Sequence, residues 1–153
     1  MYARKFIHAG ELYVGIEPTE IVTVLGSCVA VCFYDPVRRV AAMNHYLLPV
    51  WNGSDIQNPK YGEIAIPRTI ETLVNTGSDV GNLEAKLFGG ASMYDMTNES
   101  MMIGKRNIML AKDMLRKYGI AIKAEDVGGT RGRKILLRSD TGKVMMRYVS
   151  EDK

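Results

Sequence analysis

Two buried strands separated by a bend are predicted by the stretch Ile21-Val22-Thr23-Val24-Leu25-Gly26-Ser27-Cys28-Val29-Ala30-Val31-Cys32-Phe33-Tyr34-Asp35-Pro36. Both flanks of the bend are apolar and rich in β-branched residues, which is typical of strands in the interior of a sheet. Gly26 favours the bend, because glycine tolerates backbone conformations that other residues avoid. Asp35 and Pro36 favour a tight turn, so the next strand should return antiparallel to 29–34.

The pattern around these strands predicts a mixed sheet flanked by helices. Apolar residues recur at helical spacing in 61–75 and 103–118, and a glycine closes each segment. Further strands are expected at 11–16, 40–48, 83–88, 121–127, 134–138 and 143–149. Strands outnumber helices, so the fold class is α/β or α+β. No linker interrupts the chain, and 1–153 is predicted to be a single domain of ordinary size.

Composition argues against several classes of protein. The net charge is +3, and Lys and Arg are scattered rather than gathered in a block, which disfavours nucleic-acid binding. No apolar run approaches the ~20 residues of a membrane helix, and no apolar segment follows Arg4 and Lys5 as in a signal peptide. Cys28 and Cys32 would lie ~13 Å apart in a strand, too far for a disulfide. We therefore expect free thiols and a cytoplasmic location.

Cys28 is the residue best suited to nucleophilic catalysis, and His45 is its predicted partner. A cysteine nucleophile needs a base that takes its proton and donors for the oxyanion that forms. If the turn is centred between Pro36 and Val37, Cys28 lies directly opposite His45, with Cβ atoms ~4.5–5.5 Å apart. A two- or four-residue loop centred there keeps this pairing, whereas a three-residue loop would turn His45 to the other face. His8, the other histidine, lies in an N-terminus expected to be loosely ordered.

Gly26 and Ser27 are predicted to support the same site through their backbone. A bend before Cys28 would present its sulfur at a strand end, where nearby backbone N–H groups can stabilise an oxyanion. The alternative is that Cys28 is only a small buried side chain, as unpaired cysteines often are. Cys32, in the middle of an apolar run, is expected to have that structural role.

Other kinds of site find less support in the sequence. Two cysteines and one neighbouring histidine leave a zinc site short of ligands, so we expect no metal and no other cofactor. The Gly-x-Ser-x-Gly elbow of serine hydrolases does not occur. Two glycine-rich segments match no phosphate- or dinucleotide-binding pattern, and we expect them to form turns or close packing rather than anion cradles. They are Gly89-Gly90-Ala91-Ser92 and Gly128-Gly129-Thr130-Arg131-Gly132.

Several motifs along the chain together resemble one family, the chemoreceptor glutamine deamidases known as CheD. Each motif alone is weak, but their order and spacing are specific, and they cover nearly the whole chain. They are Leu25-Gly26-Ser27-Cys28-Val29-Ala30-Val31 with Asp35-Pro36, Asn44-His45-Tyr46-Leu47-Leu48-Pro49, Lys60-Tyr61-Gly62, Gly89-Gly90-Ala91-Ser92-Met93, Ile103-Gly104-Lys105-Arg106-Asn107, and Glu125-Asp126-Val127-Gly128-Gly129 with Gly132-Arg133.

This resemblance implies a fold, an activity and partners. CheD proteins hydrolyse the side-chain amide of particular glutamines on bacterial chemoreceptors, leaving glutamate and ammonia, and some also bind the phosphatase CheC. Their fold is a three-layer α/β sandwich similar to the catalytic domain of deamidating toxins. The family's nucleophile and base correspond to Cys28 and His45. A family threonine corresponds to Thr23 or to its neighbour, which here is Val22, and the two face opposite sides of a strand.

The implied mechanism passes through a thioester. His45 would hold Cys28 as a thiolate, protonate the departing ammonia and activate the water that releases glutamate. Thr23 or a backbone carbonyl is expected to orient His45. Two alternatives stay open: a binding module for receptors or a CheC-like phosphatase, and another Cys–His enzyme, such as a protease or a transglutaminase-like acyl transferase. We expect a monomer.

Overall fold

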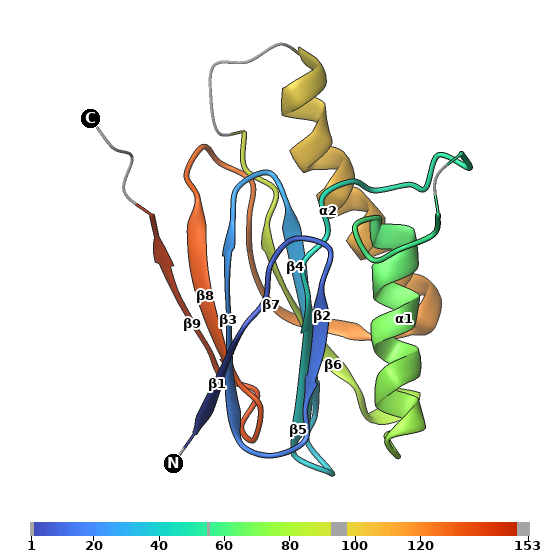
Figure 1. Cartoon of the computed structure of the whole chain (residues 1–153), viewed down its shortest axis with the longest axis vertical. Helices are drawn as coiled ribbons and strands as arrows, with labels where there is room; N and C mark the ends of the chain where they lie inside the picture. Colours follow the sequence, from blue (N-terminus) through green and yellow to red (C-terminus); the bar gives the residue numbers. More distant parts are fainter. Residues whose placement is uncertain (1, 55, 93–97, 150–153) are drawn as a thin grey trace.

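The protein folds into three layers in a computed structural model that describes residues 2–54, 56–92 and 98–149, without the side chains of 98–101 (Figure 1). One layer is a four-stranded sheet in the order β1 (Ala3–Phe6), β3 (Thr19–Leu25), β8 (Arg133–Arg138) and β9 (Val144–Tyr148). The middle layer is a five-stranded sheet in the order β2 (Leu12–Gly15), β5 (Val40–Asn44), β4 (Val29–Asp35), β6 (Glu84–Gly89) and β7 (Ala121–Val127). The third layer consists of α1 (Gly62–Asn75) and α2 (Asn98–Tyr118), and a short 3-10 helix, η1 (Val80–Asn82), leads into β6.

The predicted fold class is confirmed, with one difference in the arrangement of its strands. The strands form two sheets rather than one, and both helices cover the same face of the middle sheet (Figure 1). Each sheet is mixed, because β1–β3 and β6–β7 are parallel whereas the other strand pairs are antiparallel. α2 begins at Asn98, earlier than the expected 103. No helix in the described part of the chain is long and apolar enough to cross a membrane.

The central strand β4 is buried on both faces, which explains why the middle sheet needs a layer on each side. Val29, Val31 and Phe33 pack with residues of α1 and α2 in one apolar cluster. Ala30 and Cys32 face the other way and pack in a second cluster between the two sheets. A continuous apolar run of this kind is typical of a strand covered on both sides.

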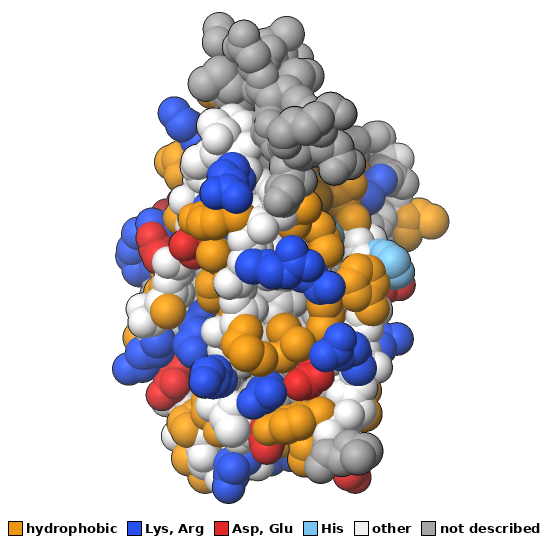
Figure 2. Space-filling model, turned by 90° about the vertical axis from the view of Figure 1, so that its left-hand side faces the viewer, with side chains coloured by type: hydrophobic (Ala, Val, Ile, Leu, Met, Phe, Trp, Pro, Cys, Tyr) orange, Lys and Arg blue, Asp and Glu red, His pale blue; other side chains and the backbone are white. Residues whose placement is uncertain are grey.

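The outer face of the four-stranded sheet is partly apolar and partly basic. Figure 2 shows Lys and Arg side chains among apolar ones on this side of the molecule. Phe6, Val24 and Met145 are exposed there. Glu20 forms ion pairs with Arg4 and Arg138 on two neighbouring strands. Because apolar side chains also lie on this exposed face, apolar and polar residues do not alternate regularly along these strands in the sequence.

The expectation of a loosely ordered N-terminus was wrong. Residues Ala3–Phe6 form strand β1, which pairs in parallel with β3, and the N–H of Ile7 continues this pairing to the carbonyl of Val22 at 2.9 Å. Every residue of β1 is exposed, so the strand has no apolar alternation by which the sequence could reveal it. Ile7, directly after it, is buried between the sheets.

The hairpin from β4 to β5 has a different register from the predicted one. Asp35 pairs with Val40, so the loop is 36–39 and its centre lies one residue later than expected, which shifts the pairing register by two residues. The side chain of Asp35 accepts hydrogen bonds from the N–H groups of Val37 and Arg38. The backbone carbonyl of Asp35 accepts one from the N–H of Arg39. Arg39 adopts a left-handed conformation with φ 59°, which closes this longer loop. β5 also ends at Asn44, earlier than the expected 48.

Candidate active site

Cys28 lies in the short bend between β3 and β4, and its side chain is half-buried. The three carbonyl groups of this bend are all held by hydrogen bonds from other parts of the chain. The carbonyl of Gly26 accepts from the N–H of Ala91 at 3.0 Å, and that of Cys28 accepts from the N–H of Gly90 at 2.8 Å. The carbonyl of Ser27 accepts from Nδ2 of Asn107 at 3.1 Å. The backbone around the thiol is therefore fixed from several sides.

The segment Gly89-Gly90-Ala91 serves close packing around this bend, as predicted. A Cβ atom on Gly89 would lie 2.2 Å from the carbonyl oxygen of Cys28, and Gly89 has a φ of 109°. Gly128, from the other glycine-rich segment, donates its N–H to the carbonyl of Gly89 at 2.9 Å. Gly89 and Gly90 thus lie where a side chain would not fit, whereas Gly128 has open space around it and contributes a positive φ of 82°. Met93, the last residue of the family motif Gly89-Gly90-Ala91-Ser92-Met93, lies outside the described residues.

His45 follows β5, and Thr23 in β3 holds its ring. The Oγ1 of Thr23 lies 2.7 Å from Nδ1 of His45 and also donates a hydrogen bond of 2.7 Å to the carbonyl of Ile7. Because a carbonyl can only accept, the single hydroxyl proton of Thr23 belongs to the bond with Ile7. Nδ1 of His45 must then donate to Thr23, which leaves Nε2 as the basic nitrogen. Val22, the other position considered for the family's threonine, faces away from this bond, on the opposite side of β3.

Cys28 and His45 lie on the same face of the middle sheet, although they are not directly opposite. Val29 and Tyr46 form an isolated bridge between them, with hydrogen bonds of 3.1 and 2.9 Å. This register makes Cys28 and His45 diagonal neighbours, whose Cα atoms are typically ~7–8 Å apart with the Cβ atoms closer. The direct pairing predicted from the turn was wrong by two residues. Since a shift of two preserves the face, both side chains still point toward the space between the sheets.

Burial shifts the pKa of both groups toward their uncharged forms. It raises the pKa of the Cys28 thiol, an effect opposed by the backbone N–H of the same residue. It also lowers the pKa of His45 to about 4, with a smaller contribution from His8 in the same direction and an opposing one from Glu11. Both directions favour the uncharged thiol and the uncharged imidazole in the free protein. The thiolate expected from the sequence stays a prediction.

Comparison with known proteins identifies the family. A family model described as CheD chemotactic sensory transduction matches residues 47–148. The chain belongs to the CheD family. It is 48% identical over 151 residues to a protein of Sulfurimonas denitrificans named probable chemoreceptor glutamine deamidase CheD, covering 98% of this chain and 97% of that protein. It is 44% identical over 147 residues to the chemoreceptor glutamine deamidase CheD of Thermotoga maritima, covering 95% and 92%.

More distant CheD relatives also align over nearly the whole chain. A probable chemoreceptor glutamine deamidase CheD of Methanococcus vannielii is 38% identical over 148 residues, which cover 96% of both proteins. The predicted family resemblance is thereby confirmed. The range matched by the family model begins after Cys28 and His45. The assignment of these two residues to the site therefore depends on the geometry described above.

Two buried polar residues of this CheD family member support the site and were not predicted from the sequence. Tyr46, next to His45, donates a hydrogen bond from its hydroxyl to the backbone carbonyl of Asn107. The side chain of Asn107 donates to the carbonyls of Ser27 and Leu47. One signal was present, because Asn107 lies four residues before Ala111, which is part of the apolar stripe of α2. A polar residue at such a position is unusual unless its hydrogen bonds are satisfied.

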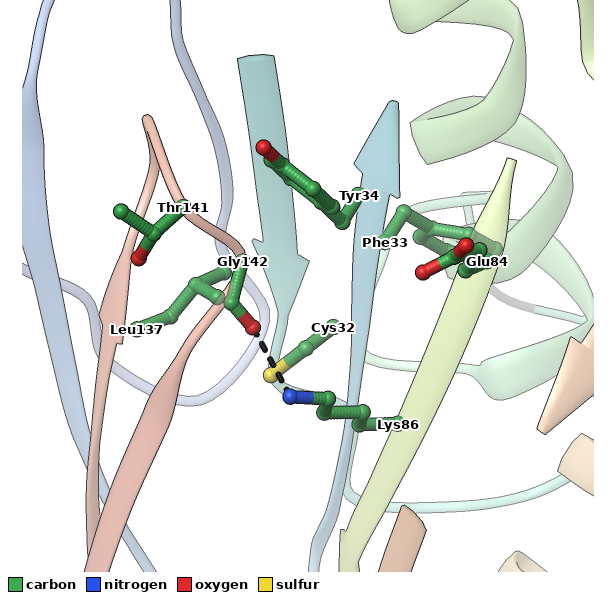
Figure 3. A pocket seen from close by; sticks show the side chains of 8 residues that line it. All are labelled: Cys32, Phe33, Tyr34, Glu84, Lys86, Leu137, Thr141 and Gly142. Carbon is green, nitrogen blue, oxygen red and sulfur yellow. Dashed lines mark hydrogen bonds between the residues drawn. The ribbon is translucent and has the colours of Figure 1, made fainter. Parts of the chain in front are cut away.

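The second cysteine of this CheD family member is part of the core, as predicted. Cys32 is 2% exposed, and burial raises the pKa of its thiol to about 12, an effect that the charge of Lys86 opposes. A cavity of about 90 Å³ lies beside it between the two sheets (Figure 3). Lys86 points into this region and donates a hydrogen bond of 3.0 Å to the carbonyl of Gly142. Neither Cys28 nor His45 lines this cavity.

Proposed function

We propose that this protein hydrolyses the side-chain amide of specific glutamines on bacterial chemoreceptors, with Cys28 as the nucleophile and His45 as the base. The hydrogen bond from His45 to Thr23 carries this proposal, because it leaves Nε2 of His45 basic on the face of the sheet that Cys28 occupies. The names of the relatives support the substrate, since they are named chemoreceptor glutamine deamidase or probable chemoreceptor glutamine deamidase.

The proposed reaction begins from the neutral pair. Nε2 of His45 takes the proton of the Cys28 thiol as the sulfur attacks the carboxamide carbon, and a tetrahedral oxyanion forms. His45 then gives this proton to the nitrogen, and ammonia leaves a thioester on Cys28. His45 next removes a proton from water, which attacks the thioester carbon. The thiol leaves with the proton held by His45, and the receptor carries a glutamate.

Backbone groups of the bend are the proposed donors to the oxyanion. Within the described residues, the N–H groups of Gly26 and Ser27 have no hydrogen-bond acceptor, and that of Cys28 faces only its own sulfur. The carbonyls of Gly26 and Ser27, which share peptide planes with the N–H groups of Ser27 and Cys28, are both hydrogen-bonded, so these two N–H groups are oriented before a substrate binds. Donors that are already oriented stabilise a developing charge without reorganisation, which is an efficient form of catalysis.

The proposed reaction places the protein in the cytoplasm as a single domain, acting on the cytoplasmic helices of receptors. Each turnover replaces a neutral amide with a carboxylate, so it adds one negative charge to a receptor helix. Binding to a CheC-like phosphatase, which the family resemblance implies, stays a prediction, as does the monomeric state.

Intact mass of a receptor cytoplasmic domain incubated with the protein tests the proposed function. Deamidation adds about one dalton for each modified glutamine, and Cys28→Ala should add none. Receptor fragments would indicate a protease instead. A stable adduct with an added primary amine would indicate an acyl transferase. An unchanged receptor mass with an intact wild-type protein would leave a binding module as the better account.

A further inference from the structure

We infer that Asn107 is a positioning residue for this reaction, which orients the Ser27–Cys28 peptide so that the N–H of Cys28 points at the oxyanion. This inference deepens the proposed function and rests on it. Its basis is the set of hydrogen bonds made by the Asn107 side chain, together with the planarity of the peptide group.

The side chain of Asn107 joins the two segments that carry the nucleophile and the base. Asn107 is fully buried in α2, and its Nδ2 donates to the carbonyl of Ser27 at 3.1 Å and to the carbonyl of Leu47 at 2.8 Å. Ser27 directly precedes Cys28, and Leu47 lies two residues after His45. Both protons of a single amide group are therefore used to hold these two segments beside each other.

The orientation of this amide is unambiguous. Its Oδ1 is buried and has no hydrogen-bond partner among the described residues. Turning the amide over would place Oδ1 against two carbonyl oxygens, which cannot donate to it. Buried polar atoms without a partner are rare and costly, so a residue that retains one has another reason to be there. Here that reason is the pair of donors that Asn107 presents on its other side.

Fixing the carbonyl of Ser27 also fixes the N–H of Cys28. The two groups belong to one planar trans peptide and point in opposite directions. Because the carbonyl points at α2, the N–H of Cys28 points away from α2, toward the space between the sheets. The Cys28 side chain packs against the apolar cluster in that same space. The N–H of Cys28 therefore lies on the same side of the bend as Sγ.

This direction suits an oxyanion donor. In the tetrahedral intermediate, the negatively charged oxygen is bonded to the carbon that Sγ has attacked, so it lies two bonds from the sulfur. An N–H directed to the side of Sγ can reach that oxygen. Asn107 itself is buried behind the bend and touches no substrate, so it acts only through the peptide that it holds.

Asn107 is also the one side chain, among the described residues, that bonds a carbonyl of the bend 26–28. The carbonyls of Gly26 and Cys28 are held by backbone N–H groups of Ala91 and Gly90, which no side-chain substitution removes. Substitution of Asn107 therefore releases one peptide of the bend while the others stay bound.

The test compares two reactions of the same thiol in Asn107→Ala and Asn107→Leu. Deamidation of a receptor cytoplasmic domain passes through an oxyanion, whereas alkylation of Cys28 by iodoacetamide is a direct displacement that forms none. We expect kcat to fall by about 10-fold to 100-fold, less than for outright loss of an oxyanion donor. KM and the alkylation rate should stay within about 3-fold, because the lost interaction acts only in the transition state. Leucine at position 107 fills the volume of the asparagine side chain, so Asn107→Leu is used for the same test if Asn107→Ala does not fold.

Thr69→Val is the matched control. Thr69 is buried in α1, on the same side of the middle sheet, and accepts a hydrogen bond of 3.1 Å from Asn44. Loss of the Thr69 hydroxyl should leave the rates of deamidation and of alkylation near those of the wild type. If the wild type deamidates the receptor and an Asn107 variant is equally active, the inference is overturned but the proposed function is not. A parallel fall of kcat and alkylation would also overturn it, since Asn107 would then act on the thiol. An inactive wild type would instead overturn the proposed function, and the inference with it.

Discussion

Thr23 Oγ1 lies 2.7 Å from Nδ1 of His45 and donates its own proton to the carbonyl of Ile7. A hydroxyl therefore takes the place that a carboxylate occupies in many catalytic triads. It fixes the ring and its tautomer, but it brings no negative charge to stabilise an imidazolium. The pKa of His45, which burial lowers to about 4, agrees with a ring that is uncharged at rest.

Thr23→Val should lower kcat by about 10-fold to 100-fold, because His45 loses the acceptor that holds its ring and selects its tautomer. Thr23→Ser keeps the hydroxyl and should retain most of the activity. Both rates are measured by the mass of the receptor domain over time. Full activity in Thr23→Val would mean that the ring needs no such support.

The reactivity of Cys28 should rise steeply at alkaline pH. Burial raises the pKa of its thiol, and the neutral His45 offers no cation to stabilise a thiolate. Alkylation by iodoacetamide, followed by peptide mass, should therefore be slow at pH 6 and still increase above pH 9. A plateau of fast alkylation between pH 5 and 7 would indicate a preformed thiolate–imidazolium pair and contradict the neutral resting state.

Folding stability should fall as the pH drops from about 6.5 to about 4. The pKa of His45 is lowered in the folded protein, so over this interval the unfolded chain binds the proton more readily and unfolding is favoured. The effect has an upper limit of roughly 3 kcal/mol and is fully relieved above pH 6.5. Urea unfolding of the wild type and His45→Gln at pH 7 and pH 4.5 measures it. The variant should lose less stability than the wild type on acidification, and an equal loss in both proteins would contradict this origin.

Gly89→Ala should destabilise the protein strongly, by more than about 3 kcal/mol, because the new Cβ would meet the backbone carbonyl of Cys28 at 2.2 Å. Gly53→Ala is the matched control. Gly53 also has a positive φ, of 85°, but no atom lies within 4 Å of the added Cβ. Its substitution should cost only about 1 kcal/mol, the strain of the backbone alone. Similar losses in the two variants, measured by urea unfolding, would show that the close approach at Gly89 is unimportant.

The sequence predicted most strands and both helices, since apolar periodicity and glycine punctuation mark them directly. It could not predict β1, whose residues are all exposed and which is held by backbone pairing. The hairpin register also escaped prediction, because the side chain of Asp35 and the left-handed Arg39 select a loop of different position. The shared face of Cys28 and His45 survived this error only because the shift was an even number of residues.

The partner of His45 and the role of Asn107 depend on contacts between distant segments. Thr23 reaches His45 from another sheet, and no spacing along the chain indicates that approach. Asn107 stands 80 positions from Ser27 in the sequence and 60 from Leu47. Such contacts follow from the packing of the layers, which the sequence pattern restricts only in part.

The central claim, that Cys28 attacks the receptor glutamine, is tested most directly by trapping the thioester. A receptor cytoplasmic domain is mixed with the protein, quenched in acid during turnover and analysed by intact mass. The account predicts a covalent species with the summed mass of receptor and protein less that of ammonia, cleaved by hydroxylamine and missing with Cys28→Ala. Ammonia release at the wild-type rate by Cys28→Ala, with no covalent species in either protein, would contradict it.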